Sequence, residues 1–155
     1  FFRPALVPDG AHAEARNIRV EGNTFVGAMT PVAFAGVDGA VVRFNTIERP
    51  ARWALRILQE NKAPGFIACR NGQFSRNIVV FRSDAWSEGG VNAGPGTEPA
   101  SFKFEGNAWF CQDAPERSKP KLPAADEALL KAHDPTHFER VLRARVGLPW
   151  HPEAP

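Results

Sequence analysis

A short phrase, in which two stretches of alternating residues flank a bend, occurs four times in this chain of 155 residues. Each copy is too short to bury its own apolar face, so the repeat predicts that the copies stack on one another. Aligned on the bend, they place Asn23, Asn45, Ser83 and Asn107 at one position. The copies are NIRVEGNTFVG (17–27), AVVRFNTIERP (40–50), NIVVFRSDAW (77–86) and SFKFEGNAWFC (101–111).

The alternation predicts which side chains of each phrase face the core. Strand side chains point to opposite faces in turn, so apolar residues of one parity should form columns inside a stack of parallel strands. We expect Asn at the bend to tolerate left-handed backbone angles and to hydrogen-bond along the stack. The expected inward residues are Ile18, Val20, Ala40, Val42, Ile78, Val80, Phe102 and Phe104 before the bend and Phe25, Ile47, Ala85 and Trp109 after it.

Three further segments predict a third strand in successive circuits of the chain, which we call coils. They are PVAFAG (31–36), WALRILQ (53–59) and GVNAG (90–94). The alternation turns six side chains inward and four outward. The inward residues are Val32, Phe34, Leu55, Ile57, Val91 and Ala93, and the outward residues are Ala33, Ala35, Arg56 and Asn92.

The repeat pattern stops near residue 112, which divides the chain into two parts. Residues 1–112 are expected to form the coils, and residues 113–155 a Pro-rich connector and an amphipathic helix. Asp134 suits the helix N-cap and Pro135 the first helical position. Such a helix would cover one end of the stack. Its predicted apolar face consists of Phe138, Val141, Leu142 and Val146.

Charge and composition exclude some classes of function. The net charge is +2 without a dominant basic cluster, which argues against a nucleic-acid partner. No apolar run approaches the length of about 20 residues that a membrane-spanning helix needs. Cys69 and Cys111 are interpreted as buried, inert thiols, although the spacing leaves a bridge between them open. The chain begins FFRP, and we interpret it as a C-terminal or internal piece of a longer protein. An open N-terminal end would then be able to stack on another copy.

The cadence of NIRVEGNTF followed by AVVRFNTI resembles the right-handed parallel β-helix proteins of the pectate-lyase-like superfamily. RWALRILQE, ACRNGQF, NIVVFRSD and ERSKPKLP further suggest a bacterial subgroup. The resemblance covers residues 15–112 and implies an all-β fold, a right-handed parallel β-helix of about four coils, with a C-terminal helical cap. It also implies a secreted or periplasmic protein with a polysaccharide partner. Many such proteins are polysaccharide lyases or glycoside hydrolases, and others are adhesins or assembly proteins.

The resemblance implies a binding groove along the third strands, where Arg56 faces outward. A lyase on an acidic glycan would need cations that bind a uronate carboxylate and a base that removes the α-proton. The alternative is a non-catalytic module that binds glycan or serves structure and assembly. An ion pair with Glu60 would explain Arg56 structurally, and a turn would explain Arg70. The candidate catalytic residues are Arg56, Lys62 and Arg70, and the candidate substrate-binding residues are Trp53, Gln59, Glu60 and Asn92.

Pairs of carboxylates and of histidines in the sequence give weaker evidence for a hydrolase site or a metal site. A hydrolase would need two carboxylates about 5–10 Å apart, for which Asp84, Glu88 and Glu60 are the candidates. His133 and His137 are four residues apart, but the intervening Pro135 breaks the helix that would align them. The sequence therefore indicates no metal site and no cofactor, Ca²⁺ included.

Overall fold

The chain forms an all-β structure of parallel strands in stacked sheets. The computed structural model describes residues 12–85 and 90–126, and each strand pairing in these ranges is parallel. Two short 3-10 helices, η2 (Pro99–Ser101) and η3 (Pro115–Arg117), lie between or after the strands. The strands are β1 (Ala15–Arg16), β2 (Arg19–Glu21), β3 (Thr24–Val26), β4 (Val32–Ala35), β5 (Val37–Asp38), β6 (Val41–Arg43), β7 (Thr46–Glu48), β8 (Trp53–Leu58), β9 (Gln73–Ser75), β10 (Ile78–Phe81), β11 (Gly90–Ala93), β12 (Lys103–Glu105) and β13 (Ala108–Cys111).

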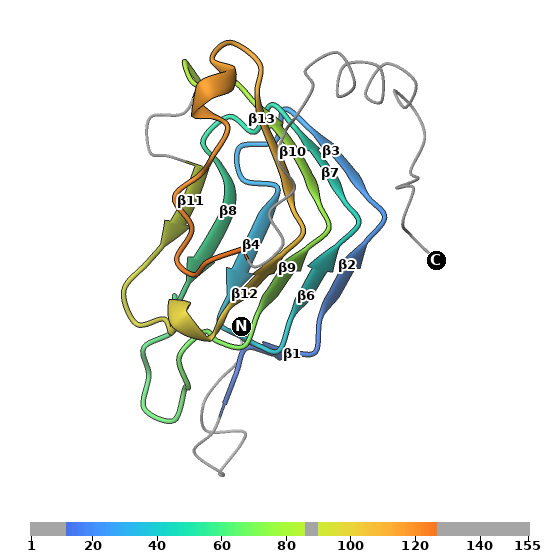
Figure 1. Cartoon of the computed structure of the whole chain (residues 1–155). Helices are drawn as coiled ribbons and strands as arrows, with labels where there is room; N and C mark the ends of the chain where they lie inside the picture. Colours follow the sequence, from blue (N-terminus) through green and yellow to red (C-terminus); the bar gives the residue numbers. More distant parts are fainter. Residues whose placement is uncertain (1–11, 86–89, 127–155) are drawn as a thin grey trace.

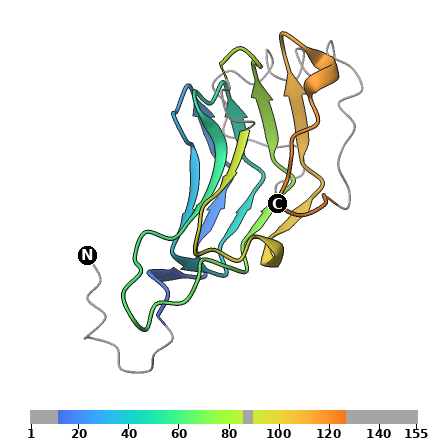
Figure 2. The ribbon, with the colours of Figure 1, turned by 90° about the vertical axis from the view of Figure 1, so that its left-hand side faces the viewer.

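Each strand pairs with the strand of the next coil and not with its neighbour in sequence. The pre-bend sheet has the order β12-β9-β6-β2, the post-bend sheet β13-β10-β7-β3, and the third sheet β11-β8-β4. In Figure 1 the bends between the first two sheets lie one behind another. Figure 2 shows the same stack from the side, with the coils following one another from blue to orange. This confirms the predicted stack of parallel strands and is consistent with a parallel β-helix.

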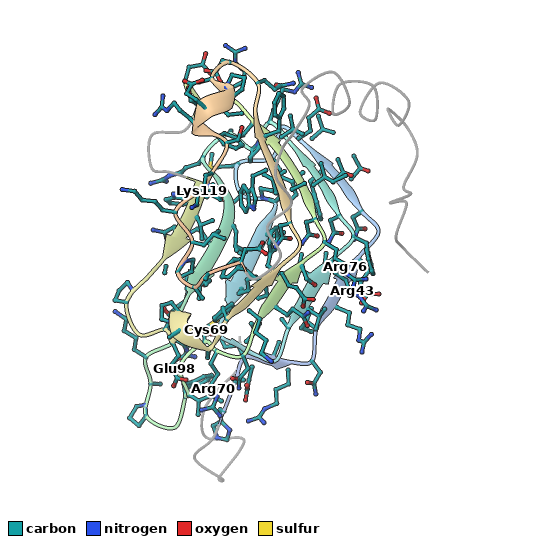
Figure 3. The ribbon with its side chains drawn as sticks, in the orientation of Figure 1. Arg43, Cys69, Arg70, Arg76, Glu98 and Lys119 are labelled. Carbon is teal, nitrogen blue, oxygen red and sulfur yellow. The ribbon has the colours of Figure 1, made fainter. Side chains whose placement is uncertain are left out.

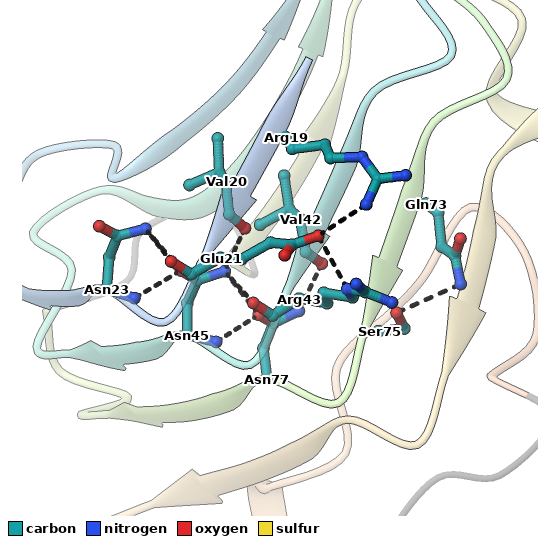
Figure 4. A network of polar contacts seen from close by, with 10 residues as sticks. All are labelled: Arg19, Val20, Glu21, Asn23, Val42, Arg43, Asn45, Gln73, Ser75 and Asn77. Carbon is teal, nitrogen blue, oxygen red and sulfur yellow. Dashed lines mark hydrogen bonds and ion pairs between the residues drawn. The ribbon is translucent and has the colours of Figure 1, made fainter. Parts of the chain in front are cut away.

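An asparagine column joins the four bends. We define the Asn column as Asn23, Asn45, Asn77 and Asn107, and we number the coils 1 to 4 by these residues. The side-chain amide of Asn23 donates to Oδ1 of Asn45 at 3.0 Å, Asn45 donates to Asn77 at 3.0 Å, and Asn77 donates to Asn107 at 3.1 Å. The backbone N–H of each donor residue bonds to the same oxygen. Figure 4 shows the first three members in line.

The expectation that Ser83 occupies the third bend is wrong, because Asn77 holds that position. Successive members of the column are 22, 32 and 30 residues apart. The strand that precedes the third bend is β9, and β10 follows the bend. The inward column of the pre-bend sheet is therefore Val20, Val42, Phe74 and Phe104, and that of the post-bend sheet is Phe25, Ile47, Val79 and Trp109.

The corrected alignment also reverses the predicted facing of β10. Val79 and Phe81 belong to the main core cluster, whereas Ile78 and Val80 belong to a second cluster with Ala108 and Phe110. Because neighbouring strand residues face opposite sides, this second cluster lies on the outer face of the post-bend sheet. Ala85 lies beyond β10 and takes no part in the core cluster. The predicted inward facing of Ile78, Val80 and Ala85 is thus wrong.

The left-handed backbone at each bend lies one residue before the asparagine. The φ angle is 68° at Gly22, 56° at Phe44, 51° at Arg76 and 62° at Gly106. None of the four asparagines has a positive φ among the described residues. Asparagine therefore serves the bends by its hydrogen bonds and not, as also expected, by its tolerance of left-handed angles.

The C-terminal end of the stack is covered by the segment that follows β13. Asp126 pairs with Phe104 at the edge of the pre-bend sheet, and its carboxylate accepts hydrogen bonds from the N–H groups of Gly106 and Asn107. Leu122 and Ala124 pack against the main core. The connector itself thus covers this end, and the helix predicted beyond residue 134 lies outside the described residues.

Candidate functional site

The third sheet carries the predicted Arg56 and Asn92 side by side on one face. Its register aligns Ala33, Arg56 and Asn92 across β4, β8 and β11, as the alternation predicted. The Arg56 Nε–H donates to Oδ1 of Asn92 at 3.2 Å. The bond leaves the terminal guanidinium nitrogens as the donors available to a ligand. Ala33, on the other side of Arg56, is exposed and small. The guanidinium is therefore held in place on an open sheet face.

The ring of Trp53 makes a cation–π contact with the Arg56 guanidinium. The Arg56 guanidinium lies over the Trp53 ring at 4.4 Å from the centroid, and that of Arg52 lies over it at 4.0 Å. In the pairing of β11 with β8, Gly90 lies opposite Trp53 and Val91 lies opposite Leu55, so Ala54 is an extra residue in β8. Ala54 belongs to the main core cluster, whereas Trp53 does not. Trp53 is only 4% exposed. Its ring therefore positions two cations and offers little surface on which a sugar could stack.

Arg70, the third candidate catalytic residue, lies in another part of the structure. Its Nη2 donates to Oδ2 of Asp38 at 3.4 Å, beside the short sheet of β1 and β5. Asn71 donates to the same carboxylate at 2.7 Å, and this bond is the main reason that the pKa of Asp38 lies below its usual range. Figure 3 shows Arg70 near Glu98, at the end of the molecule away from Lys119. This arginine is part of a structural ion pair.

The loop after β8 brings the remaining candidates to the side of the N-terminal segment. The Gln59 side-chain amide donates to the backbone oxygen of Asn61 at 2.8 Å, and the Asn61 N–H donates to Glu14 at 3.3 Å. Glu60 and Lys62 are exposed in this loop. No described contact joins any of them to Arg56, so the ion pair with Glu60, the structural alternative considered for Arg56, is not formed.

Of the carboxylates considered for a hydrolase, Asp84 is bonded to an arginine, and Glu60 is exposed in the loop after β8. Asp84 forms two hydrogen bonds with Arg82, at 3.0 and 2.6 Å, which lower its pKa. Asp113 accepts from the backbone N–H of Ser83 at 2.7 Å, and this bond is the first cause that holds its pKa far below the ordinary value. Glu88 lies outside the described residues, as do His133 and His137.

The two cysteines and the side chains able to bind metal form no further candidate site in the described part of the chain. Cys69 and Cys111 are both free and buried, as predicted, and burial raises the pKa of each thiol. Across residues 12–85 and 90–126, no group of three or more His, Cys, Asp and Glu side chains is placed to hold a metal ion. In the same ranges, no helix is long and apolar enough to cross a membrane.

Sequence reasoning missed Arg52 as a member of the cluster. Arg52 directly precedes Trp53, the first residue of β8, and an arginine three residues after that tryptophan suggests two cations around one ring. We define the Arg–Trp cluster as Arg52, Trp53, Arg56 and Asn92.

Comparisons with known proteins do not extend this description. No protein-family model, no curated protein and no solved structure matches the chain.

Proposed function

We propose that this chain is part of a right-handed parallel β-helix of the pectate-lyase-like superfamily that binds an acidic polysaccharide on the outer face of its third sheet. The observation that carries the proposal is the fixed guanidinium of Arg56, which is bonded to Asn92 and stacked on Trp53. An exported location, secreted or periplasmic, would follow from such a ligand.

The chemistry of the Arg–Trp cluster suits a carboxylate on a sugar ring. A guanidinium whose Nε–H is engaged by an amide still presents its two terminal nitrogens, which can form paired bonds with a carboxylate. The cation–π contact with Trp53 restricts the side chain before any ligand arrives, and a restricted side chain loses less entropy on binding. Ala33 and Ala35 leave space for a flat chain of sugars along the sheet.

Titration calorimetry with polygalacturonate and alginate, beside a neutral galactan, tests the proposal. We expect binding of an acidic glycan that weakens with salt, and about a ten-fold loss of affinity in Arg56→Gln, equivalent to about 1.4 kcal/mol. Arg19→Gln is the matched control, because it removes one exposed positive charge from the pre-bend sheet. Equal losses in both variants would show a nonspecific charge effect, and no binding to any acidic glycan would refute the proposal.

Lyase activity is the second candidate, and the position of Arg56 on the same face favours it over a hydrolase. In β-elimination a base removes the α-proton of the uronate, a double bond forms in the sugar ring, and the glycosidic oxygen leaves. Of the three candidate catalytic residues, Arg56 is the one that lies in the Arg–Trp cluster, where its guanidinium would neutralise the uronate carboxylate. Unsaturated ends that absorb ultraviolet light would support this chemistry. Binding without such product would assign the chain to the non-catalytic alternative.

A further inference from the structure

The outer face of the post-bend sheet carries a patch of apolar side chains that is deeply buried. We define the outer patch as Ile78, Val80, Ala108 and Phe110. Val80 is 0% exposed and Phe110 is 4% exposed, whereas Val26, in the same outward column on the strand of coil 1, is 54% exposed. One face of a single sheet is thus open in coil 1 and covered in coils 3 and 4.

The outer patch lacks an apolar partner among the described residues. The main core cluster has partly buried residues from other segments packed against it, whereas the outer patch has none in residues 12–85 and 90–126. A contiguous apolar patch on the outside of a sheet marks a surface on which another element packs. The outer patch therefore needs a cover from beyond these ranges.

The chain enters the described fold on the side away from the outer patch. The His12 N–H donates to the oxygen of Gly65 at 2.8 Å, and the His12 oxygen accepts from Ile67 at 2.8 Å. These contacts lie on the loop that leads from the third sheet to the pre-bend sheet, a corner that faces the post-bend sheet across the coil. The entering chain therefore approaches a different side of the stack.

The C-terminal part of the chain leaves the described fold beside the outer patch. The Asp126 carboxylate accepts from the N–H groups of Gly106 at 2.8 Å and Asn107 at 3.2 Å, at the bend where β13 begins. Figure 1 shows β13 next to β10, and these two strands carry all four members of the patch. The chain after Asp126 thus starts at the edge of the outer patch.

The sequence after Asp126 contains the side chains that this surface requires. Four apolar residues recur there at helical spacing, and we call them the apolar stripe. They are Phe138, Val141, Leu142 and Val146. Arg145 falls within the same stripe, and the half-buried Glu48, which lies opposite Val80 in the sheet, is a carboxylate that its guanidinium would meet. The end of the stack, the other surface that a helix could cover, is already occupied by Leu122 and Ala124.

We propose that residues 134–147 of this chain form an amphipathic helix that docks on the outer patch, with its apolar stripe over Val80 and Phe110 and Arg145 beside Glu48. The link from Asp126 is long enough, because an extended chain advances about 3.3 Å per residue and neighbouring strands are about 4.8 Å apart. A helix in this place adds a second apolar layer to the outside of the post-bend sheet. The C-terminal segment is then part of the core of the fold and not a cap on its end.

Paramagnetic broadening of methyl signals in the full chain tests the proposal. A nitroxide spin label is attached at Ala144→Cys, on the side of the proposed helix away from the apolar stripe, and the two native cysteines are buried. We expect the methyl signals of Ile78 and Val80 to lose intensity while the label is oxidised and to recover it when the label is reduced. The methyl signals of Val32, in the third sheet, should lose much less.

Two matched variants of the labelled chain show whether the apolar stripe holds the helix in place. Leu142→Asp puts a charge into the stripe and should abolish the broadening at the outer patch. Arg140→Asp, on the opposite face of the proposed helix, changes the net charge by more and should keep the broadening. Unchanged methyl shifts of Val32 in both variants would show that the coils remain folded, so that a lost signal reports undocking.

Each outcome supports or overturns the proposal. Broadening at Ile78 and Val80 that Leu142→Asp removes and Arg140→Asp keeps supports it. Broadening at Leu122 instead would place the segment on the end of the stack and overturn the proposal, and so would the absence of broadening at the outer patch. Broadening that persists in Leu142→Asp would overturn the role of the apolar stripe. The result is independent of glycan binding, which involves the third sheet.

Discussion

The ring of Phe102 occupies the space in which a side chain on residue 72 would begin. An ideal Cβ on Gly72 would stand 2.1 Å from Cε1 of Phe102. The Phe102 ring in turn packs edge-on against Phe34, with centroids 5.1 Å apart and planes at 82°. A large residue in coil 4 thus depends on the smallest residue in coil 3.

Gly72→Ala should therefore destabilise the fold. The methyl group would displace a ring that is only 2% exposed, and overpacking of this kind costs about 1–3 kcal/mol. Urea unfolding followed by tryptophan fluorescence would measure the change. Gly94→Ala is the control, because its Cβ would meet its nearest atom, the oxygen of Ile57, at an ordinary 3.5 Å. Equal effects at the two sites would contradict the assigned contact.

Asn77→Ala should cost more than about 2 kcal/mol, because it leaves several buried groups without partners. Asn45 donates to Oδ1 of Asn77 from its backbone and its side chain, and the Asn77 amide donates to the oxygen of Val42. Asn23→Ala removes the exposed member of the same column and should cost less than about 1 kcal/mol. Chemical denaturation of the two variants would compare them. Similar losses would show that burial does not determine the contribution of the column.

Arg76→Gly should stabilise the protein by about 0.5–1 kcal/mol, because the relief of left-handed strain, about 1–2 kcal/mol, exceeds the entropic cost of glycine, about 0.5–1 kcal/mol. Arg76 has a φ of 51°, which glycine adopts without strain, and its N–H bond to the oxygen of Glu105 would remain. The same change at Lys103, in a strand with an ordinary backbone, should destabilise by a similar amount. Thermal and urea unfolding would give both values. A loss of stability at Arg76 would instead show that its guanidinium, 5.9 Å from the Phe44 centroid, matters more than the backbone.

Asp113 should make the stability of the fold depend on pH in the acidic range. Its pKa in the folded chain is far below the ordinary 3.8, chiefly because the Ser83 N–H bonds to the charged carboxylate. A lowered folded pKa means that this contribution is fully present above the unfolded value and is lost as the pH falls toward the folded value. The urea midpoint of the parent should therefore exceed that of Asp113→Asn at pH 6. The difference should shrink steadily below about pH 4, and a constant difference would contradict the assignment.

The sequence predicted the stacking because three bends repeat the same short pattern. Asn23, Asn45 and Asn107 were aligned correctly, and so was the register of Ala33, Arg56 and Asn92. The third bend was missed for a physical reason. In β10 every residue is buried, so no alternation marks its faces, and β9 has one inward apolar residue, Phe74, between polar neighbours.

The candidate site was predicted in part for a related reason. Residues on a regular strand, such as Arg56 and Asn92, could be placed by period alone. Arg70 and Lys62 lie in or after the long loop that follows β8, where no period applies, and the contact with Asp38 depends on how that loop returns to the stack. The bulge that turns Trp53 away from the core has no marker in the sequence.

The unequal spacing of the bends has a consequence for how such a chain can change. Coils of 22, 32 and 30 residues share one asparagine column. The additional residues of the longer coils therefore lie in the connections between strands and do not change the register of the strands. The excursions after β8 and after β10 are therefore sites where insertions or deletions would alter the surface and spare the architecture. Peptide epitopes grafted there would be held at both ends by paired strands. Changes in the length of these connections would be tolerated far better than a single residue inserted within a strand.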